Sequence, residues 1–100
     1  MASLKESEVQ TLLLRRLRDE FPGIYVRKIH QTQFSHNGIP DLVGCLNGMF
    51  FAIEVKKRGG KLSALQQREL DFILESDGIG LICWEEGDIT RVIDDLRIYL

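Results

Sequence analysis

The residues best suited to chemistry lie in one segment of the chain, GIPDLVGCLNGMFFAIEVKK. The Asn47-Gly48 pair, between two apolar β-type runs, favours a β-hairpin with a two-residue type I′ turn. This turn fixes the strand register and brings Asp41 directly opposite Glu54, with their Cβ atoms ~5 Å apart. Lys56 lies two residues after Glu54 and therefore projects from the same face of the strand. The hairpin thus predicts two carboxylates and one ammonium close together.

Two facing carboxylates are unfavourable in a β-ladder, because like charges on directly opposed residues repel each other. A divalent cation bound between them would turn this repulsion into attraction. Mg²⁺ prefers oxygen ligands and keeps several waters, one of which can become the nucleophile while the metal polarises a phosphoryl oxygen. A nearby lysine can orient that water or stabilise charge on the phosphate. The pattern indicates phosphodiester hydrolysis with Mg²⁺ or Mn²⁺ as cofactor.

A plainer interpretation of each piece also exists. Asp41 after Pro40 is ordinary turn chemistry. Glu54 and Lys56 are compatible with an exposed strand face. The prediction of a site therefore depends on the hairpin register, because only this register brings Asp41 close to Glu54 and Lys56.

Two residues outside the hairpin are further candidates for the site. Around a helix, Glu6 lies within about 60° of an apolar stripe that includes Val9 and Leu13, whereas Glu8 lies about 200° away. Acids on an inward face are rare unless they are paired or metal-bound, so Glu6 is predicted to belong to the site; fraying at the helix start is the alternative. Gln66 closes the capping box SALQ and could serve as cap, as site residue, or as both.

A basic loop with two glycines follows the hairpin. Lys57, Arg58 and Lys61 are predicted to contact phosphates there, although plain solvation would also explain them. His36, in the polar segment before the hairpin, could approach a phosphate and is otherwise a polar loop residue. Trp84, in the apolar run IGLICWE, is predicted to fill the core.

Charge is divided unevenly along the chain, which has a net charge of −2. Residues 1–68 hold eleven of the 13 Lys and Arg but six of the 15 acids, a net charge of +5. Residues 69–100 have a net charge of −7. Electrostatic potential is local at physiological salt, so the basic part could still face phosphates.

Length and composition predict a single domain over residues 1–100, because 100 residues at 44% hydrophobic suffice for one modest core. No apolar run approaches the ~20 residues of a membrane span, and the N-terminus lacks the apolar core of a signal peptide. A cytoplasmic protein is expected. Cys45 and Cys83 have no metal-ligand spacing and are predicted to be buried thiols in a reducing compartment.

Periodicity and turn residues predict the element order αβββαβα. The predicted elements are a helix over 4–20, strands over 24–30, 40–46 and 49–56, a helix over 63–76, a strand over 79–85, and a short helix or strand–helix piece over 89–99. The second helix has four apolar residues, Leu65, Leu70, Ile73 and Leu74. Interleaved strands and helices indicate the α/β class, with a mixed central sheet flanked by helices.

The motifs together resemble those of a known family. Their order is Gly38-Ile-Pro40-Asp41, then Ile53-Glu54-Val55-Lys56, then Leu62-Ser63-Ala-Leu-Gln66. This set resembles the G-x-P-D, E-x-K and L-S-x-x-Q motifs of the stand-alone virus-type replication-repair nuclease (VRR-NUC) domain. That family belongs to the PD-(D/E)XK, restriction-endonuclease-like superfamily, and the resemblance covers about the whole chain.

The resemblance implies a restriction-endonuclease-like αβββαβ core and a specific set of site residues. Metal binding would fall to Asp41, Glu54 and the carbonyl of Val55, catalysis to Lys56, and supporting roles to Glu6 and Gln66. It also implies a domain akin to archaeal Holliday-junction resolvases, which act as homodimers, and an origin in a phage or bacterium.

The leading hypothesis is therefore a metal-dependent, structure-selective DNA endonuclease that acts on branched DNA such as Holliday junctions. Alternatives are a flap or fork nuclease, a restriction-type nuclease, or a catalytically silent nuclease fold that only binds DNA. The short chain argues against a separate sequence-reading domain, and the intact Asp41, Glu54 and Lys56 argue against a silent fold.

Overall fold

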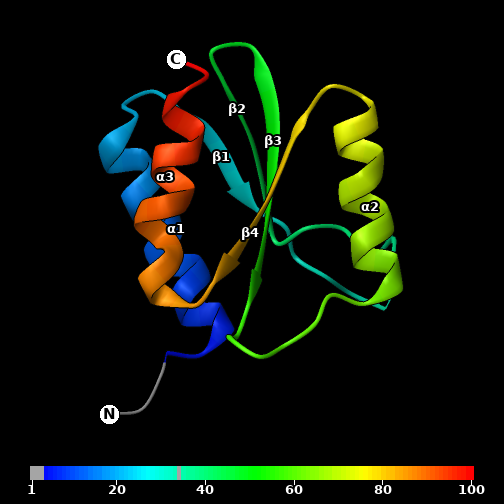
Figure 1. Cartoon of the computed structure of the whole chain (residues 1–100). Coiled ribbons are helices and arrows are strands. Elements are labelled where there is room, and N and C mark those ends of the chain that lie inside the picture. The colour runs from blue at the N-terminus through cyan, green and yellow to red at the C-terminus, as the bar shows by residue number, and fades with distance from the viewer. Residues whose placement is uncertain (1–3, 34) are drawn as a thin grey trace.

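The chain folds into alternating helices and strands. The computed structural model describes residues 4–33 and 35–100. The elements in chain order are α1 (Glu6–Glu20), β1 (Tyr25–Lys28), β2 (Leu42–Leu46), β3 (Met49–Lys56), α2 (Ala64–Glu75), β4 (Ile79–Trp84), a 3₁₀-helix (Glu86–Asp88) and α3 (Ile89–Arg97). This order confirms the predicted αβββαβα arrangement, with a helix as the last element (Figure 1).

The described residues form one four-stranded mixed sheet with the strand order β1-β2-β3-β4. The first three strands are antiparallel neighbours, whereas β4 runs parallel to β3. Leu46 pairs with Met49 across the hairpin, which is the register that the Asn-Gly turn predicts. Asn47 and Gly48 both have positive φ, 52° and 84°, as a type I′ turn requires.

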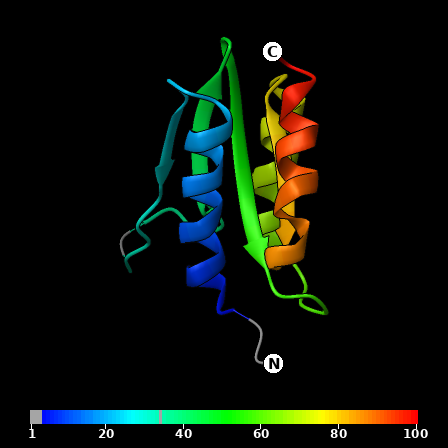
Figure 2. The ribbon, with the colours of Figure 1, turned by 90° about the vertical axis from the view of Figure 1, so that its left-hand side faces the viewer.

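Helices cover the two faces of the sheet unequally. Figures 1 and 2 show α1 and α3 side by side on one face, with α2 on the other. The core lies between the sheet and the pair α1 and α3. Its fully buried side chains include Phe51, Ile53 and Val55 of β3, Leu13 and Leu17 of α1, and Val92, Ile93 and Leu96 of α3. The apolar stripe of β3 therefore points toward α1 and α3.

α2 buries fewer apolar side chains than α1 or α3 does. Within α2, all of which the structure describes, Leu70 alone is buried. Leu65 is 46% exposed and Leu74 is 52% exposed, so the predicted apolar side of this helix is only partly covered. The helix contacts mainly β3 and β4. A Cβ at Gly80 of β4 would lie 3.3 Å from the Leu70 side chain, so glycine lets the helix approach closely.

Two residues predicted to be buried are not. Cys83 is buried, and burial raises the pKa of its thiol to about 12, but Cys45 is exposed. Trp84 is only half-buried, at the end of β4. Both lie on strand positions that alternate away from the core, on the side that α2 covers only in part. None of the helices over residues 4–33 and 35–100 is long and apolar enough to cross a membrane.

Candidate active site

The hairpin register places Asp41 and Glu54 opposite each other. Leu42, the first residue of β2, pairs with Ile53 of β3, so the preceding residue, Asp41, faces Glu54. Oδ2 of Asp41 accepts a hydrogen bond of 2.8 Å from the backbone N–H of Val55. This bond fixes the Asp41 carboxylate against β3, next to the Glu54 carboxyl group.

Glu54 is 3% exposed, which makes it the one buried charged residue among those described. Burial, a hydrogen bond with Asp41 and the charge of Asp41 raise the pKa of Glu54 to about 8, and the charge of Glu6 acts in the same direction. The charge of Lys56 lowers it. Within the described residues, Oε2 of Glu54 is buried and has no hydrogen-bond partner. Such an oxygen is costly in a folded protein, and a bound cation would satisfy it.

Gln66 is both cap and site neighbour. Its Oε1 accepts a hydrogen bond of 2.9 Å from the N–H of Ser63, and its own N–H donates to the Ser63 hydroxyl at 3.1 Å, which closes the capping box. Its Nε2 donates to Oε1 of Glu54 at 3.4 Å. The first turn of α2 therefore contacts the buried carboxyl group directly, and the two interpretations of Gln66 are not exclusive.

Glu6 reaches the site and Glu8 does not. Oε2 of Glu6 accepts a hydrogen bond of 2.9 Å from the backbone N–H of Lys57, directly after β3. Oε1 of Glu8 accepts one of 3.0 Å from the N–H of Lys5, at the start of its own helix. Lys56, the last residue of β3, is half-buried and directly precedes Lys57, the residue that donates to Glu6. Its charge lowers the pKa of Glu54, and its side chain projects from the same face of β3 as Glu54.

Gly38 brings the loop before β2 against α2. Its φ is +86°, a region that favours glycine. A Cβ at this position would lie 2.6 Å from the carbonyl oxygen of Leu65, the residue before Gln66. In the sequence, the only sign of this close approach is the glycine two residues before Pro40. The sequence pattern does not show that the backbone there contacts Leu65.

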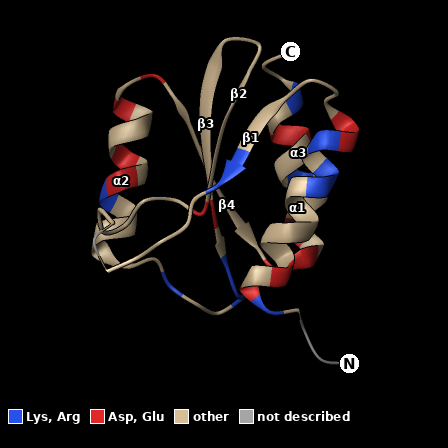
Figure 3. Cartoon of the chain, turned by 180° about the vertical axis from the view of Figure 1, so that it is seen from behind, with Lys and Arg blue, Asp and Glu red and all other residues tan. Residues whose placement is uncertain are grey.

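The basic residues that follow β3 are all exposed. Figure 3 shows them in blue on the loop between β3 and α2. Lys57, Arg58 and Lys61 lie on the loop that leads to α2. Arg58 pairs with Glu85 at 2.5 Å, directly after β4. The loop therefore presents positive charge beside the end of β3, where Glu6 and Lys56 lie.

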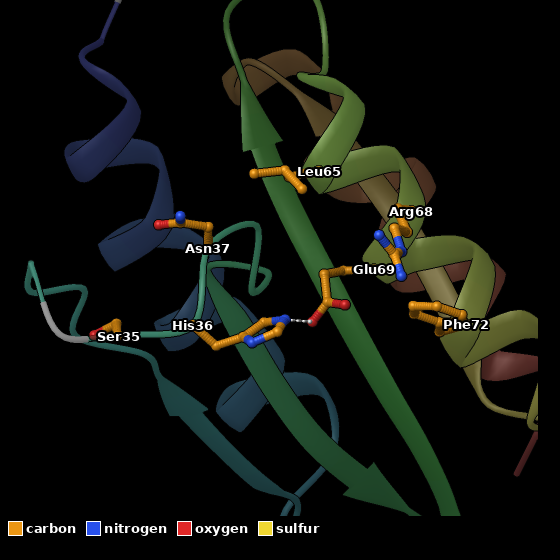
Figure 4. A pocket seen from close by; sticks show the side chains of 7 residues that line it. All are labelled: Ser35, His36, Asn37, Leu65, Arg68, Glu69 and Phe72. Atoms are coloured by element: carbon orange, nitrogen blue, oxygen red, sulfur yellow. Dashed lines mark ion pairs between the residues drawn. The ribbon is translucent and has the colours of Figure 1, made fainter.

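His36 lies beside α2 rather than in the basic loop. It forms an ion pair of 3.4 Å with Glu69 when protonated. The two residues line a cavity of about 400 Å³, shown in Figure 4, with Ser35, Asn37, Leu65, Arg68 and Phe72. Glu69 is three residues after Gln66, so His36 lies along α2 one turn away from the residue that contacts Glu54.

The basic part of the sequence does not form one surface. Arg15, Arg16 and Arg18 belong to α1, on the face of the sheet opposite α2 (Figures 1 and 3). Lys57 and Lys61 lie at the end of β3 instead. The positive charges of residues 1–68 are therefore divided between α1 and the loop after β3.

The donor groups fit a divalent cation that prefers oxygen. No group of three or more His, Cys, Asp or Glu residues that could hold a metal ion occurs among residues 4–33 and 35–100. Protein ligands would be the two facing carboxylates of Asp41 and Glu54, with a backbone carbonyl such as that of Val55. Few protein ligands with retained waters are typical of Mg²⁺. The unpartnered oxygen of Glu54 supports this fit.

The fold and the site define the class: an α/β protein with the carboxylate–lysine arrangement of PD-(D/E)XK nucleases. The family model of the VRR-NUC domain matches residues 2–83, and the chain belongs to the VRR-NUC family. Membership implies nuclease activity, with DNA as substrate, in a family that generally uses divalent metal ions.

Solved structures agree with this membership. One, a VRR-NUC domain, is 25% identical, with a TM-score of 0.73 over 89% of this chain and 94% of that chain. Another, a VRR-NUC domain protein, is 19% identical, with a TM-score of 0.80 over 99% of this chain and 93% of that chain. The second likeness concerns the fold alone. None of the curated proteins matches the chain.

Proposed function

We propose that this protein is a metal-dependent endodeoxyribonuclease that hydrolyses phosphodiester bonds in branched DNA, with four-way junctions as the preferred substrate. The observation that carries the proposal is the buried Glu54 carboxyl group facing Asp41, with one oxygen that has no hydrogen-bond partner among the described residues. With a pKa of about 8, the metal-free Glu54 carboxyl group keeps its proton near neutral pH, and a divalent cation would replace this proton and satisfy the unpartnered oxygen.

The proposed mechanism assigns a role to each side chain at the site. Asp41 and Glu54, with the carbonyl of Val55, would hold Mg²⁺ or Mn²⁺, which supplies a polarised phosphoryl oxygen and an activated water. Lys56 would stabilise negative charge that develops on the phosphate. Its charge lowers the pKa of Glu54.

Two further side chains would position the carboxylates rather than react. Gln66 donates to Glu54 Oε1 and so orients the carboxyl group from the α2 side. Glu6 holds the backbone at Lys57 and so fixes the end of β3 that carries Lys56. Partners of this kind commonly affect metal affinity or activity by about 10–100-fold.

DNA would be held through its backbone. Lys57 and Lys61, on the loop after β3, would make these contacts, whereas Arg58 of the same loop is already paired with Glu85. Contacts to phosphate carry no base information. His36 would contact a strand that passes along α2. Binding through phosphates weakens steeply with salt, so a salt titration of affinity reports on this mode.

Homodimerisation would supply the second cut that a four-way junction needs. One site cuts one strand at a time, and two-fold pairing provides two symmetric sites. Val92, Ile93 and Leu96 are buried against the chain's own sheet, so these residues are not free to form an interface. The exposed aromatic side chains on the α2 side of the sheet, Tyr25, Phe50 and Phe72, are the better support for one.

A cleavage panel tests the proposal. Duplex, flap, fork and four-way-junction DNA are incubated with Mg²⁺, Mn²⁺ or EDTA. We expect cleavage with either metal, none in EDTA, and none by Asp41→Asn or Glu54→Gln, while both variants still bind DNA. Undiminished cleavage in EDTA would reject the mechanism. Faster cleavage of flaps than of junctions would reject the substrate assignment and leave the nuclease assignment intact.

Lys56 and Lys57 provide a matched pair for the same panel. Alternation places Lys56 on the face of Glu54 and the next residue on the other side of the chain. We expect Lys56→Ala to lower single-turnover cleavage by about 100-fold or more, and Lys57→Ala to lower mainly DNA affinity. Equal losses in cleavage rate would contradict the role of Lys56.

A further inference from the structure

Trp84 lies beside Lys56 on the side of the sheet that carries the site. The parallel strands β3 and β4 pair Lys56 with Trp84 and, one step before, Glu54 with Ile82. Paired residues of neighbouring strands project from the same face, so the side chains of Trp84 and Lys56 share the face that carries Glu54. Trp84 is half-buried, so part of its side chain reaches the surface. The position therefore offers aromatic surface to a ligand bound at Lys56.

A cavity of about 400 Å³ opens at this indole. Its lining residues are Arg58, Ile82, Trp84, Asp88 and Arg91. Asp88 accepts hydrogen bonds from the backbone N–H of Trp84 at 2.9 Å and from Arg91 at 2.7 Å, and Arg91 donates to the carbonyl of Ile82 at 2.6 Å. Asp88 and Arg91 are thus bound to each other and to β4. The indole ring of Trp84 takes part in none of these hydrogen bonds.

The end of β4 is fixed relative to the end of β3. Glu85 directly follows Trp84 and has φ 62°, ψ 178°, a conformation unusual for a residue with a side chain. Its N–H donates to the carbonyl of Lys56 at 3.0 Å, and its carboxylate pairs with Arg58 at 2.5 Å. The indole is consequently pre-organised beside the site, which lowers the entropic cost of binding a ligand there.

The charges of the cavity favour a base over a phosphate as its ligand. Each of its two arginines is paired with a carboxylate, Arg58 with Glu85 and Arg91 with Asp88. Little net positive charge is left to bind an anion. The flat aromatic surface of Trp84 is suited to stacking, which every nucleobase can provide. A base inside a duplex is already stacked on both sides, so the ligand must be unpaired.

We propose that Trp84 forms a stacking subsite for an unpaired base of the DNA strand whose phosphate reaches Lys56. This inference rests on the proposed nuclease function. It narrows the substrates to DNA in which the base next to the cut is unpaired and not stacked within a duplex. Trp84 would position the strand and take no part in the chemical step.

Trp84 is the one tryptophan of the chain, so its fluorescence reports on the subsite directly. A short labelled oligothymidylate is titrated in EDTA, with binding followed by anisotropy and the indole followed by its emission. We expect quenching that saturates together with the anisotropy. Trp84→Leu should weaken binding about tenfold and Trp84→Phe much less, as expected for stacking. Ile98→Ala is the control, since it removes an apolar side chain that is 76% exposed. The neighbouring Tyr99 carbonyl accepts a hydrogen bond from Asn47 in the β2–β3 turn, at the opposite end of β3 from Lys56.

An abasic substrate separates stacking from a structural role of the indole. The base next to the cut is removed from a branched substrate, and single-turnover cleavage is measured with Mg²⁺. We expect wild type to cut the abasic substrate about tenfold more slowly, and Trp84→Leu to cut both substrates at one low rate. Thermal unfolding of each variant verifies that it is folded.

Unchanged indole emission with or without oligonucleotide binding would overturn the subsite, as would an equal abasic effect in wild type and Trp84→Leu. Quenching without cleavage of any DNA would instead reject the proposed nuclease function and leave the subsite standing.

Discussion

Glu6 and Glu8 show how two carboxylates in the first turn of one helix can make different contacts. Glu6 accepts from the backbone after β3, whereas Glu8 accepts from the backbone at the start of α1. We expect Glu6→Ala to lower single-turnover cleavage by about 10–100-fold. Glu8→Ala should leave the cleavage rate unchanged and lower stability by about 1 kcal/mol through loss of a helix cap.

Urea unfolding and single-turnover kinetics on both variants provide the measurement. A strong loss of cleavage in Glu8→Ala together with a normal rate in Glu6→Ala would contradict the assignment of Glu6 to the site.

Glu54 should make the stability of the metal-free protein depend on pH. Its pKa is about 8 in the folded protein, against an ordinary value of 4.5. The unfolded chain therefore releases this proton at lower pH than the folded chain does, so the free energy of unfolding falls as pH rises from about 4.5 to about 8. Glu54→Gln cannot titrate and should lack this part of the decrease. Urea unfolding in EDTA across the range tests this; parallel profiles for both proteins would contradict it.

At the scale of elements, Gly38 connects the loop before β2 to the first turn of α2. Gly38→Ala should be destabilising for two reasons, the positive φ and the clash with the Leu65 carbonyl. Gly23 is the matched control, because it has the same φ of +86° and would place its Cβ in open space. We expect Gly23→Ala to cost about 1 kcal/mol and Gly38→Ala more.

Gly38→Ala should also reduce cleavage, because Gln66 moves with the first turn of α2. Urea unfolding and cleavage are measured for both variants. If Gly23→Ala and Gly38→Ala lower the free energy of unfolding equally and have equal cleavage rates, the close approach at Gly38 has no effect on stability or on the site.

The elements that the sequence predicts best are those with strong local signals. The bounds of β3 agree fully with the predicted 49–56, because the Asn47-Gly48 turn fixes where the strand begins and which residues face each other. The register of Asp41 and Glu54 depends on the same turn. β1 is shorter than predicted and ends at Lys28, since alternation in residues 24–30 does not show where a pairing partner ends.

The burial of Cys45 and Trp84 depends on tertiary packing that local sequence patterns do not contain. Alternation shows which residues of a strand share a face, but not how far a helix covers that face. The run that contains Trp84 is apolar on both faces, so its pattern could not distinguish the core side from the side of the site. Likewise, the contact between Gln66 and Glu54 requires the packing of α2, which a capping box does not specify.

At the scale of the whole molecule, the proposed dimer has a direct test. We expect light scattering to return twice the 11.5 kDa mass of the chain. Phe50→Asp places a charge among the exposed aromatic side chains and should yield a monomer that nicks junctions without paired cuts. Leu100→Asp is the control, because Leu100 is 66% exposed at the end of the chain. A wild-type monomer, with and without junction DNA, would remove the dimer.

The light anchoring of α2 has a consequence for the motion of the molecule. Local opening requires least free energy where few apolar side chains are buried, and α2 buries Leu70 alone among its described residues. Its amide hydrogens should therefore exchange with solvent faster than those of α1 and α3. Each opening would carry Gln66 away from Glu54. A divalent metal ion bound at the carboxylates should slow amide hydrogen exchange in α2 selectively. Deuterium uptake followed by mass spectrometry would show whether opening of the helix is coupled to metal binding at the site.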